Sequence, residues 1–202
     1  MAIATEAPAP ALTNELTYEL TYEAYMAEPT VYGRYDIVNG VRIFMPGATW
    51  DHQEIALNLG ELLRGYARSS GVGKANIAPF DVLIRRTPKL QTRQPDVLFI
   101  SRLRLAQIGG RPATGPLAVA PELVVEIVSD SETQRVLGDK LTDYVSIGVS
   151  ECWVVRPDAG TTEVLALTPE GTRSVATYGD GEEVQSVVFA GLSVSVADIF
   201  AA

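Results

Sequence analysis

Residues 122–128 read Glu-Leu-Val-Val-Glu-Ile-Val, an almost continuous apolar run with one carboxylate, Glu126, in its interior. Such a run is typical of a central strand that is covered on both faces. Upstream, residues 94–100 read Gln-Pro-Asp-Val-Leu-Phe-Ile and predict a second buried strand. Downstream, residues 132–147 have helical apolar spacing, and Gly148 is a typical helix end. This order favours an α/β (α+β) fold, with a mixed central sheet flanked by helices.

The remaining segments extend this fold toward both ends of the chain. Asn39-Gly40 lies between two alternating runs and predicts an N-terminal hairpin of residues 34–38 and 41–45, because both turn residues tolerate positive φ. Residues 50–69 predict a long amphipathic helix that ends at Gly71. We further expect a short helix over 17–26, a strand at 80–85 paired with 94–100, additional C-terminal strands at 151–155, 163–167 and 186–189, and a closing helix at 196–200.

Length and composition limit the classes of protein that the chain can belong to. Its 202 residues, 47% of them apolar, fit one domain over residues 15–202 after an Ala/Pro-rich N-terminal tail, residues 1–14. The lone Cys152 and lone His52 exclude an internal disulfide framework, a cysteine-cluster zinc site and a multi-histidine metal centre. Any metal must therefore be held mainly by oxygen. No apolar stretch approaches the roughly 20 residues of a membrane span, and we expect a cytoplasmic protein.

Three charged residues stand where burial makes a charge costly. Glu126 lies inside the central apolar run, Asp96 enters a buried strand directly after Pro95, and Lys140 lies within the apolar stripe of the 132–147 helix. Each has an ordinary structural explanation: a bonded glutamate at a strand end, a turn aspartate, and a lysine that extends along the edge of the stripe. Together they indicate more. Two carboxylates can bind Mg²⁺ or Mn²⁺, and a lysine can neutralise charge on a phosphate, which is the chemistry of a metal-dependent nuclease.

Several motifs resemble those of one family. Arg34-Tyr-Asp-Ile-Val-Asn-Gly, His52, Ala78-Pro-Phe-Asp-Val, Gln94-Pro-Asp-Val, Leu123-Val-Val-Glu-Ile-Val-Ser, Lys140-Leu-Thr-Asp-Tyr and Cys152-Trp-Val-Val occur in order at near-family spacing. They resemble the Uma-type endonucleases of the PD-(D/E)XK superfamily, whose fold is that of many restriction enzymes. The resemblance implies a restriction-endonuclease-like fold, DNA as substrate and metal binding by Asp96 and Glu126. It also implies a catalytic lysine that has moved to Lys140, a recurrent histidine at His52, and a homodimer.

The chain departs from the family pattern at several positions. Val136 and Val41 stand where the family often has acidic residues, Val128 occupies the usual lysine position of the superfamily, and Ser129-Asp130-Ser131 replaces Ser-Pro-Ser. Two hypotheses therefore remain open. The first is a Mg²⁺-dependent endonuclease that uses Asp96, Glu126, Lys140 and His52. The second is a non-catalytic nucleic-acid-binding or homo-oligomeric module on the same fold.

The charges are distributed unevenly along the chain. The net charge is −9, yet residues 85–111 contain seven basic residues and one acidic residue, Asp96. This segment could form a basic patch that holds a phosphate backbone beside the metal site. It could equally be a solvated loop that pairs with acidic neighbours. No P-loop, nucleophile elbow or dinucleotide fingerprint is present, so no organic cofactor is expected.

Overall fold

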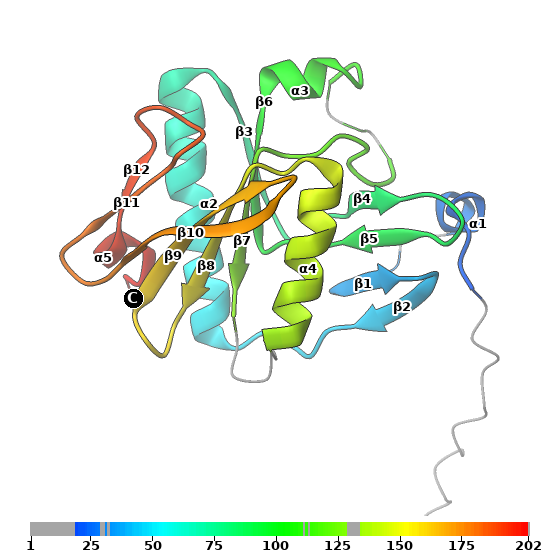
Figure 1. Cartoon of the computed structure of the whole chain (residues 1–202), viewed down its shortest axis with the longest axis horizontal. Helices are drawn as coiled ribbons and strands as arrows, with labels where there is room; N and C mark the ends of the chain where they lie inside the picture. Colours follow the sequence, from blue (N-terminus) through cyan, green and yellow to red (C-terminus); the bar gives the residue numbers. More distant parts are fainter. Residues whose placement is uncertain are drawn as a thin grey trace, which may run out of the picture.

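A six-stranded mixed sheet forms the centre of the protein. The computed structural model describes residues 19–28, 31, 33–110, 112, 114–128 and 134–201. The strand order is β10-β9-β8-β7-β6-β3 (Figure 1). The strands are β3 (Gly73–Ile77), β6 (Val97–Ser101), β7 (Leu123–Ile127), β8 (Glu151–Arg156), β9 (Thr161–Thr168) and β10 (Gly171–Tyr178). Only β7 and β8 are parallel, which requires a crossover connection between them.

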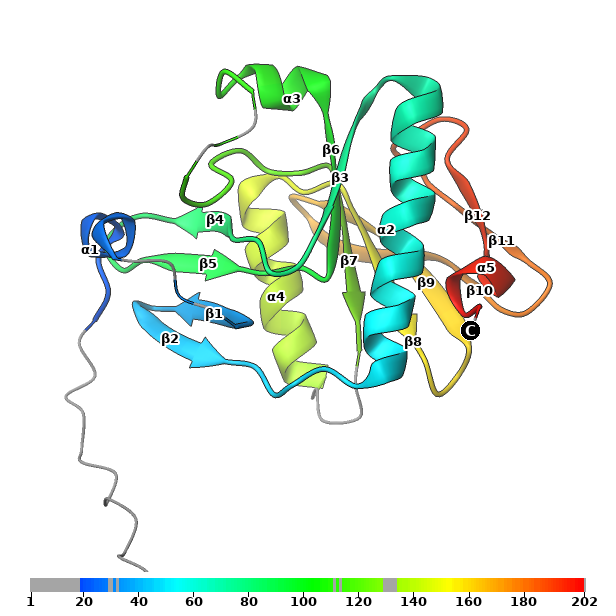
Figure 2. The ribbon, with the colours of Figure 1, turned by 180° about the vertical axis from the view of Figure 1, so that it is seen from behind.

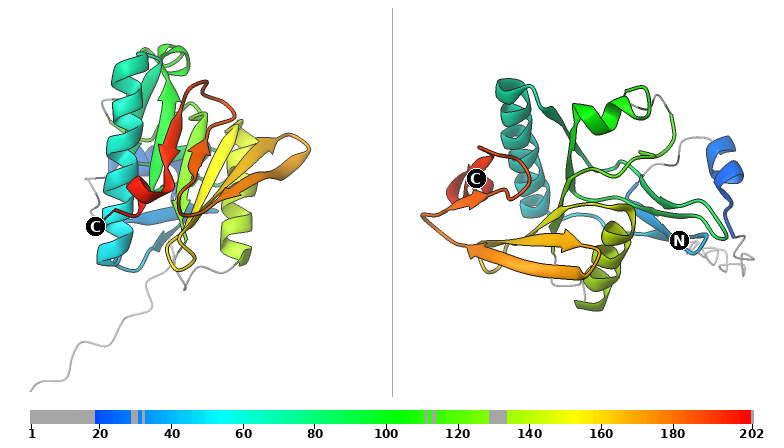
Figure 3. Two further views of the ribbon diagram at one scale, coloured as in Figure 1. Left: turned by 90° about the vertical axis from the view of Figure 1, so that its left-hand side faces the viewer. Right: turned by 45° about the horizontal axis from the view of Figure 1, so that its top comes forward.

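Two helices cover opposite faces of this sheet (Figure 3). Helix α2 (Trp50–Ser70) packs on one face, in a core that includes Leu59 and Trp153. Helix α4 (Gln134–Ile147), part of the β7–β8 crossover, packs on the other, in a core that includes Leu137 and Tyr144. Because α2 and α4 cover both faces, all five residues of β7 are buried, as the apolar run predicts.

A second, four-stranded sheet lies beside the first. Its order is β2-β1-β5-β4, with β1 (Tyr35–Val38), β2 (Val41–Phe44), β4 (Val82–Arg85) and β5 (Gln91–Arg93). Helix α1 (Tyr22–Ala27) contributes to its separate small core. Since β5 ends at Arg93 and β6 begins at Val97, residues 94–96 join the two sheets. This connection places Asp96 at the junction between them.

The remaining elements lie at the periphery (Figure 2). Helix α3 (Arg102–Ala106) follows β6 directly, and its N-cap is Ser101, whose side chain accepts a hydrogen bond from the Arg104 N–H. The chain ends in the β11 (Glu183–Gln185) and β12 (Ser193–Ser195) pair and α5 (Val196–Ile199), which pack on the α2 side of the sheet. No helix in the described ranges is both long and apolar enough to cross a membrane.

The expected fold class is confirmed, as are the 39–40 hairpin and the long helix. Thr49 caps the N-terminus of α2 by accepting a hydrogen bond from the His52 N–H, and Gly71 ends the helix with φ +69°. The N-terminal tail, Thr17, Arg111 and Ser129-Asp130-Ser131 lie outside the described residues.

Two expectations about strands are wrong. The segment at 80–85 does not pair with 94–100; β4 pairs with β5, and β6 pairs with β3 and β7. β5 reads Gln-Thr-Arg and has no apolar pattern, so its burial depends on tertiary neighbours. The expected strand at 186–189 is a loop, because the Ser186 hydroxyl and the Val187 and Val188 N–H groups donate to the Glu151 carboxylate. The sequence patterns also do not predict β3, β10 and α3.

Candidate active site

Asp96 lies at the junction of the two sheets and is 2% exposed. Its Oδ2 accepts a hydrogen bond of 2.7 Å from the Ile127 N–H at the end of β7. Its Oδ1 forms ion-pair contacts with Arg34 Nη1 at 2.7 Å and His52 Nε2 at 3.3 Å. Burial acts to raise the pKa of Asp96, but the contacts from His52 and Arg34 outweigh it and lower that pKa. Asp96 is therefore held in its ionised form.

Glu126 lies in β7 and is 1% exposed. Its Oε2 accepts a hydrogen bond of 2.7 Å from Lys140 Nζ, and its Oε1 accepts one of 2.5 Å from the Tyr144 hydroxyl. Lys140 and Tyr144 are one turn apart on α4, so both reach the same carboxylate. Burial raises the pKa of Glu126 to about 7, although the Lys140 charge acts to lower it and the Asp96 charge acts to raise it.

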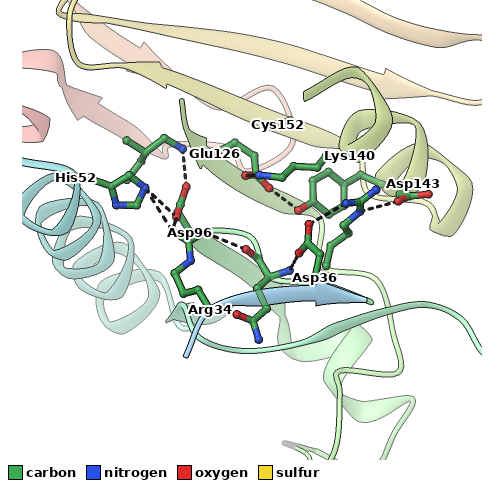
Figure 4. Close-up of polar contacts among 12 residues, drawn as sticks. Arg34, Asp36, His52, Asp96, Glu126, Lys140, Asp143 and Cys152 are labelled. Carbon is green, nitrogen blue, oxygen red and sulfur yellow. Dashed lines mark hydrogen bonds and ion pairs between the residues drawn. The ribbon is translucent and has the colours of Figure 1, made fainter. Parts of the chain in front are cut away.

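The two carboxylates meet at the same end of neighbouring strands (Figure 4). Val97 pairs with Val125 in the antiparallel register; Asp96 directly precedes Val97, and Glu126 directly follows Val125. Glu126 is bonded to residues of α4, whereas Asp96 contacts His52 of α2. The candidate site therefore lies at the end of the sheet and includes residues from the helices on both of its faces. It brings together all four residues singled out from the sequence.

A second cluster of buried charges borders this site. Arg93 donates to Asp36 Oδ2 at 2.8 Å and to Asp143 Oδ2 at 2.7 Å. Asp36 Oδ1 also accepts a hydrogen bond from the Gln94 N–H at 3.0 Å, two residues before Asp96. Burial acts to lower the pKa of Arg93, but the two carboxylates raise it overall. This network fixes β1, β5 and α4 relative to the segment that carries Asp96 (Figure 4).

A pocket of about 400 Å³ opens beside Asp96 and is bordered by Arg34, the first turn of α2 and residues 77–79. Trp50 lies at this pocket with 81% of its surface exposed, and its indole N–H donates to Glu54 at 2.8 Å. An exposed tryptophan offers a flat apolar face next to the charged groups. The pocket therefore gives a ligand access to the Asp96 side of the site.

The donor set suits a hard divalent cation. Asp96 and Glu126 supply carboxylate oxygens, and Asp96 Oδ1 is a buried atom that has charged groups nearby but accepts no well-aligned hydrogen bond from the described residues. Within the described ranges, no group of three or more His, Cys, Asp or Glu residues is arranged to hold a metal. Two carboxylates are nevertheless a common set for Mg²⁺, which keeps several of its waters when it binds a protein. The residues thus fit a magnesium or manganese ion.

The basic segment 85–111 does not form a single patch. Arg93 is buried between Asp36 and Asp143, Lys89 pairs with Glu19 at 2.5 Å, and Arg104 pairs with Glu122 at 3.2 Å. Of the two interpretations of this segment, pairing with acidic neighbours holds for these three residues. The carboxylates that neutralise them come from distant parts of the chain, so the sequence window alone suggests more free charge than the structure has.

The comparisons with known proteins agree with this architecture. The sequence profile of the Uma2 family, described as "Putative restriction endonuclease", matches residues 22–197. The chain belongs to the Uma2 family. A solved structure from Anabaena variabilis ATCC 29413, described as a putative nuclease of DUF820, is similar to this Uma2 chain with a TM-score of 0.70 and 18% identity. That similarity covers 90% of this chain and 97% of the other, and it shows a shared fold. No curated protein matches.

Sequence reasoning misses four contributors to the site of this Uma2 protein. Arg34 and Tyr144 stand in family-like motifs but have no role there. Asp36 and Asp143 are not candidates. A signal is present for Asp36, because Tyr-Asp-Ile-Val places an acid inside a short apolar strand. For Asp143 the only signal is its place in the Lys140-Leu-Thr-Asp-Tyr motif, since one acid on a helix is usually exposed.

Proposed function

We propose that this protein is a Mg²⁺- or Mn²⁺-dependent endonuclease that hydrolyses phosphodiester bonds in DNA. The observation that carries the proposal is the meeting of Asp96 and Glu126 at one end of the sheet, with Lys140 on one carboxylate and Arg34 and His52 on the other. Family membership supports the general activity. The homodimer expected from the resemblance is part of the proposal.

Asp96 and Glu126 would hold the ion, with solvent and the phosphate supplying the remaining ligands. When bound, such an ion withdraws charge from the scissile phosphate and makes water more acidic. Lys140, whose Nζ lies 2.7 Å from Glu126, would neutralise the negative charge that develops on the phosphate during phosphoryl transfer. Arg34 is 20% exposed at its side chain and contacts Asp96, so its guanidinium is available to a phosphate at the pocket.

His52 Nε2 faces Asp96, while its Nδ1 is buried without a hydrogen-bond partner in the described part of the chain. This arrangement lets the ring hold the Asp96 carboxylate in position. We assign His52 the role of a positioning residue. Replacing His52 by asparagine should reduce the affinity for the metal while having a smaller effect on the stability of the fold.

The test is nicking of supercoiled plasmid DNA with Mg²⁺, Mn²⁺ or EDTA. Wild type should nick the plasmid with either metal and not with EDTA, and Asp96→Asn should be inactive. Asp51→Asn is the matched control, because Asp51 is exposed on α2. A metal-induced rise in melting temperature, present in wild type and absent in Asp96→Asn, would support the metal site separately from cleavage.

The non-catalytic hypothesis predicts a different pattern. Both carboxylates already have partners inside the protein, which is compatible with a purely structural role. In that case no metal would support nicking and the melting temperature of wild type would not respond to Mn²⁺. That combined result would replace the endonuclease proposal by a nucleic-acid-binding or homo-oligomeric module.

A further inference from the structure

A large basic groove lies along the edge strand β3. It is centred on the start of β3, away from the candidate active site. Its volume is about 1140 Å³, and four cationic side chains among the described residues line it: Arg64, Arg68, Lys74 and Arg102. They come from α2, β3 and α3, which lie around this edge in Figure 2. Apolar residues of β6 and α3 also line the groove. We call this feature the β3 groove.

The charges of the β3 groove are available to a ligand. All four cationic residues are exposed, and none forms a hydrogen bond or an ion pair through its side chain with any residue in the described ranges. No acidic residue in the described part of the chain lines the groove, although the whole chain has a net charge of −9. On a protein whose net charge is negative, cations that gather without neighbouring acids indicate a specific site for a polyanionic ligand. They do not indicate general attraction of the whole surface to polyanions.

The β3 edge is itself open. β3 is the last strand in the order of the six-stranded sheet, and among the described strands it pairs only with β6. The first residue of β3, Gly73, has no room for a side chain. A Cβ there would lie 2.4 Å from the Ile100 carbonyl oxygen and 2.5 Å from the Phe99 ring. Lys74, the next residue of β3, and Arg102, which follows β6, line the same groove.

The β3 groove runs toward the candidate active site. Helix α2 borders both cavities, with Arg64 and Arg68 at the groove and Trp50 at the pocket beside Asp96. β3 connects them in the same way: Ala75 lines the groove, and Ile77, the next residue on the same face of the strand, lines the pocket. The distance along the strand between these two residues is about 7 Å. At about 3.4 Å per nucleotide of one strand, this corresponds to roughly two nucleotides.

We propose that the β3 groove binds the phosphate backbone of one DNA strand and guides it toward the pocket at Asp96. The proposal rests on the proposed function, because it names the route of the substrate to that site. Arg64 and Arg68 are one turn apart, about 6 Å along the helix axis, so they meet different phosphates of the strand. Trp50 then offers its face to a base next to the site.

The experiment measures binding of a fluorescein-labelled DNA duplex by fluorescence anisotropy, in EDTA, at salt concentrations from about 50 to about 200 mM. The groove variant combines Arg64→Gln, Arg68→Gln and Arg102→Gln. The control variant combines Arg86→Gln, Lys89→Gln and Arg173→Gln, which removes the same charge from exposed positions outside the groove. Melting temperatures confirm that both variants fold.

Removing the cation that contacts one phosphate should reduce the slope of log K against log salt by about 1. We therefore expect the groove variant to reduce that slope by about 3 and the control variant to leave it nearly unchanged. Equal reductions in the two variants, an unchanged slope in the groove variant, or no DNA binding by wild type at the lowest salt concentration would overturn the groove proposal.

Binding in EDTA separates this proposal from the proposed function. If wild type binds DNA through the groove but does not nick it with any metal, the groove proposal would be supported and the endonuclease proposal refuted. If wild type nicks DNA and the groove variant binds and nicks DNA like the control variant, the nuclease proposal would be supported and the groove proposal refuted.

Discussion

Arg93 and Arg102 belong to one basic segment, yet they have opposite environments. Arg93 is buried and donates to the carboxylates of Asp36 and Asp143. Arg102 is exposed, lines the β3 groove and makes no side-chain ion pair with described residues. A charge inside this protein therefore holds its elements together, whereas a charge on the groove remains available to a ligand. The candidate active site follows the first pattern.

The largest effect that we expect is on stability, from the loss of Arg93. Arg93→Met should lower the free energy of unfolding by about 3–5 kcal/mol, because it leaves buried carboxylates without their cation. Urea denaturation gives the value, with Arg102→Met as the matched control. A decrease of less than about 1 kcal/mol for Arg93→Met would contradict the structural role of the interior charge.

The next effect concerns cleavage. If the protein is an active nuclease, Lys140→Ala should reduce the cleavage rate on the order of 10²–10³-fold, the usual cost of one preorganised group that stabilises developing charge. Lys89→Ala, at an exposed lysine paired with Glu19, should cleave like wild type. Metal binding, followed by the Mn²⁺-induced rise in melting temperature, should persist in Lys140→Ala. Full cleavage by this variant would refute the role given to Lys140.

Glu126 should impose a pH dependence on stability in the metal-free protein. Its pKa is raised from 4.5 to about 7, so the folded state keeps a proton that the unfolded chain releases. Between pH 4.5 and 7 the free energy of unfolding therefore decreases as pH rises, with a contribution on the order of 1 kcal/mol per pH unit. Urea denaturation in EDTA should show this slope in wild type and in Glu61→Gln, an exposed control, but not in Glu126→Gln. The same slope in all three proteins would contradict the raised pKa.

Trp50 tests whether the pocket at Asp96 receives a base. Trp50→Ala should weaken binding of single-stranded DNA by about 1 kcal/mol, roughly fivefold, the lower end for a base stacked on an aromatic ring. Phe44→Ala, another exposed aromatic, should bind like wild type. Fluorescence anisotropy in EDTA measures both. Equal affinities for the two variants would exclude stacking on Trp50.

The smallest effect completes the comparison. Arg64→Gln should change the free energy of unfolding by less than about 0.5 kcal/mol, because its side chain is exposed and has no partner among the described residues. Urea denaturation measures the change. A decrease of about 2 kcal/mol or more would show that the groove cations, like Arg93, stabilise the fold.

Local patterns in the sequence were sufficient to predict the central strand and the two long helices, and to single out Glu126 and Lys140 as charged residues in buried positions. The apolar run at 122–128 predicts β7 because a strand covered on both faces has no polar alternation, and Glu126 stands out against that background. Lys140 is found in the same way, from its place within the apolar stripe of a helix. Periodicity and the cost of burying a charge are local properties, so they can be recognised in one segment at a time.

The tertiary structure was needed to tell which charges are paired and which are free. β5 is polar throughout and is buried because Asp36 and Asp143, from distant elements, hold Arg93. The β3 groove collects cations from α2, β3 and α3, and of these only Arg102 belongs to the basic segment of the sequence. Pairing depends on distances in space between residues far apart in the chain, and the order of residues along the chain does not contain those distances.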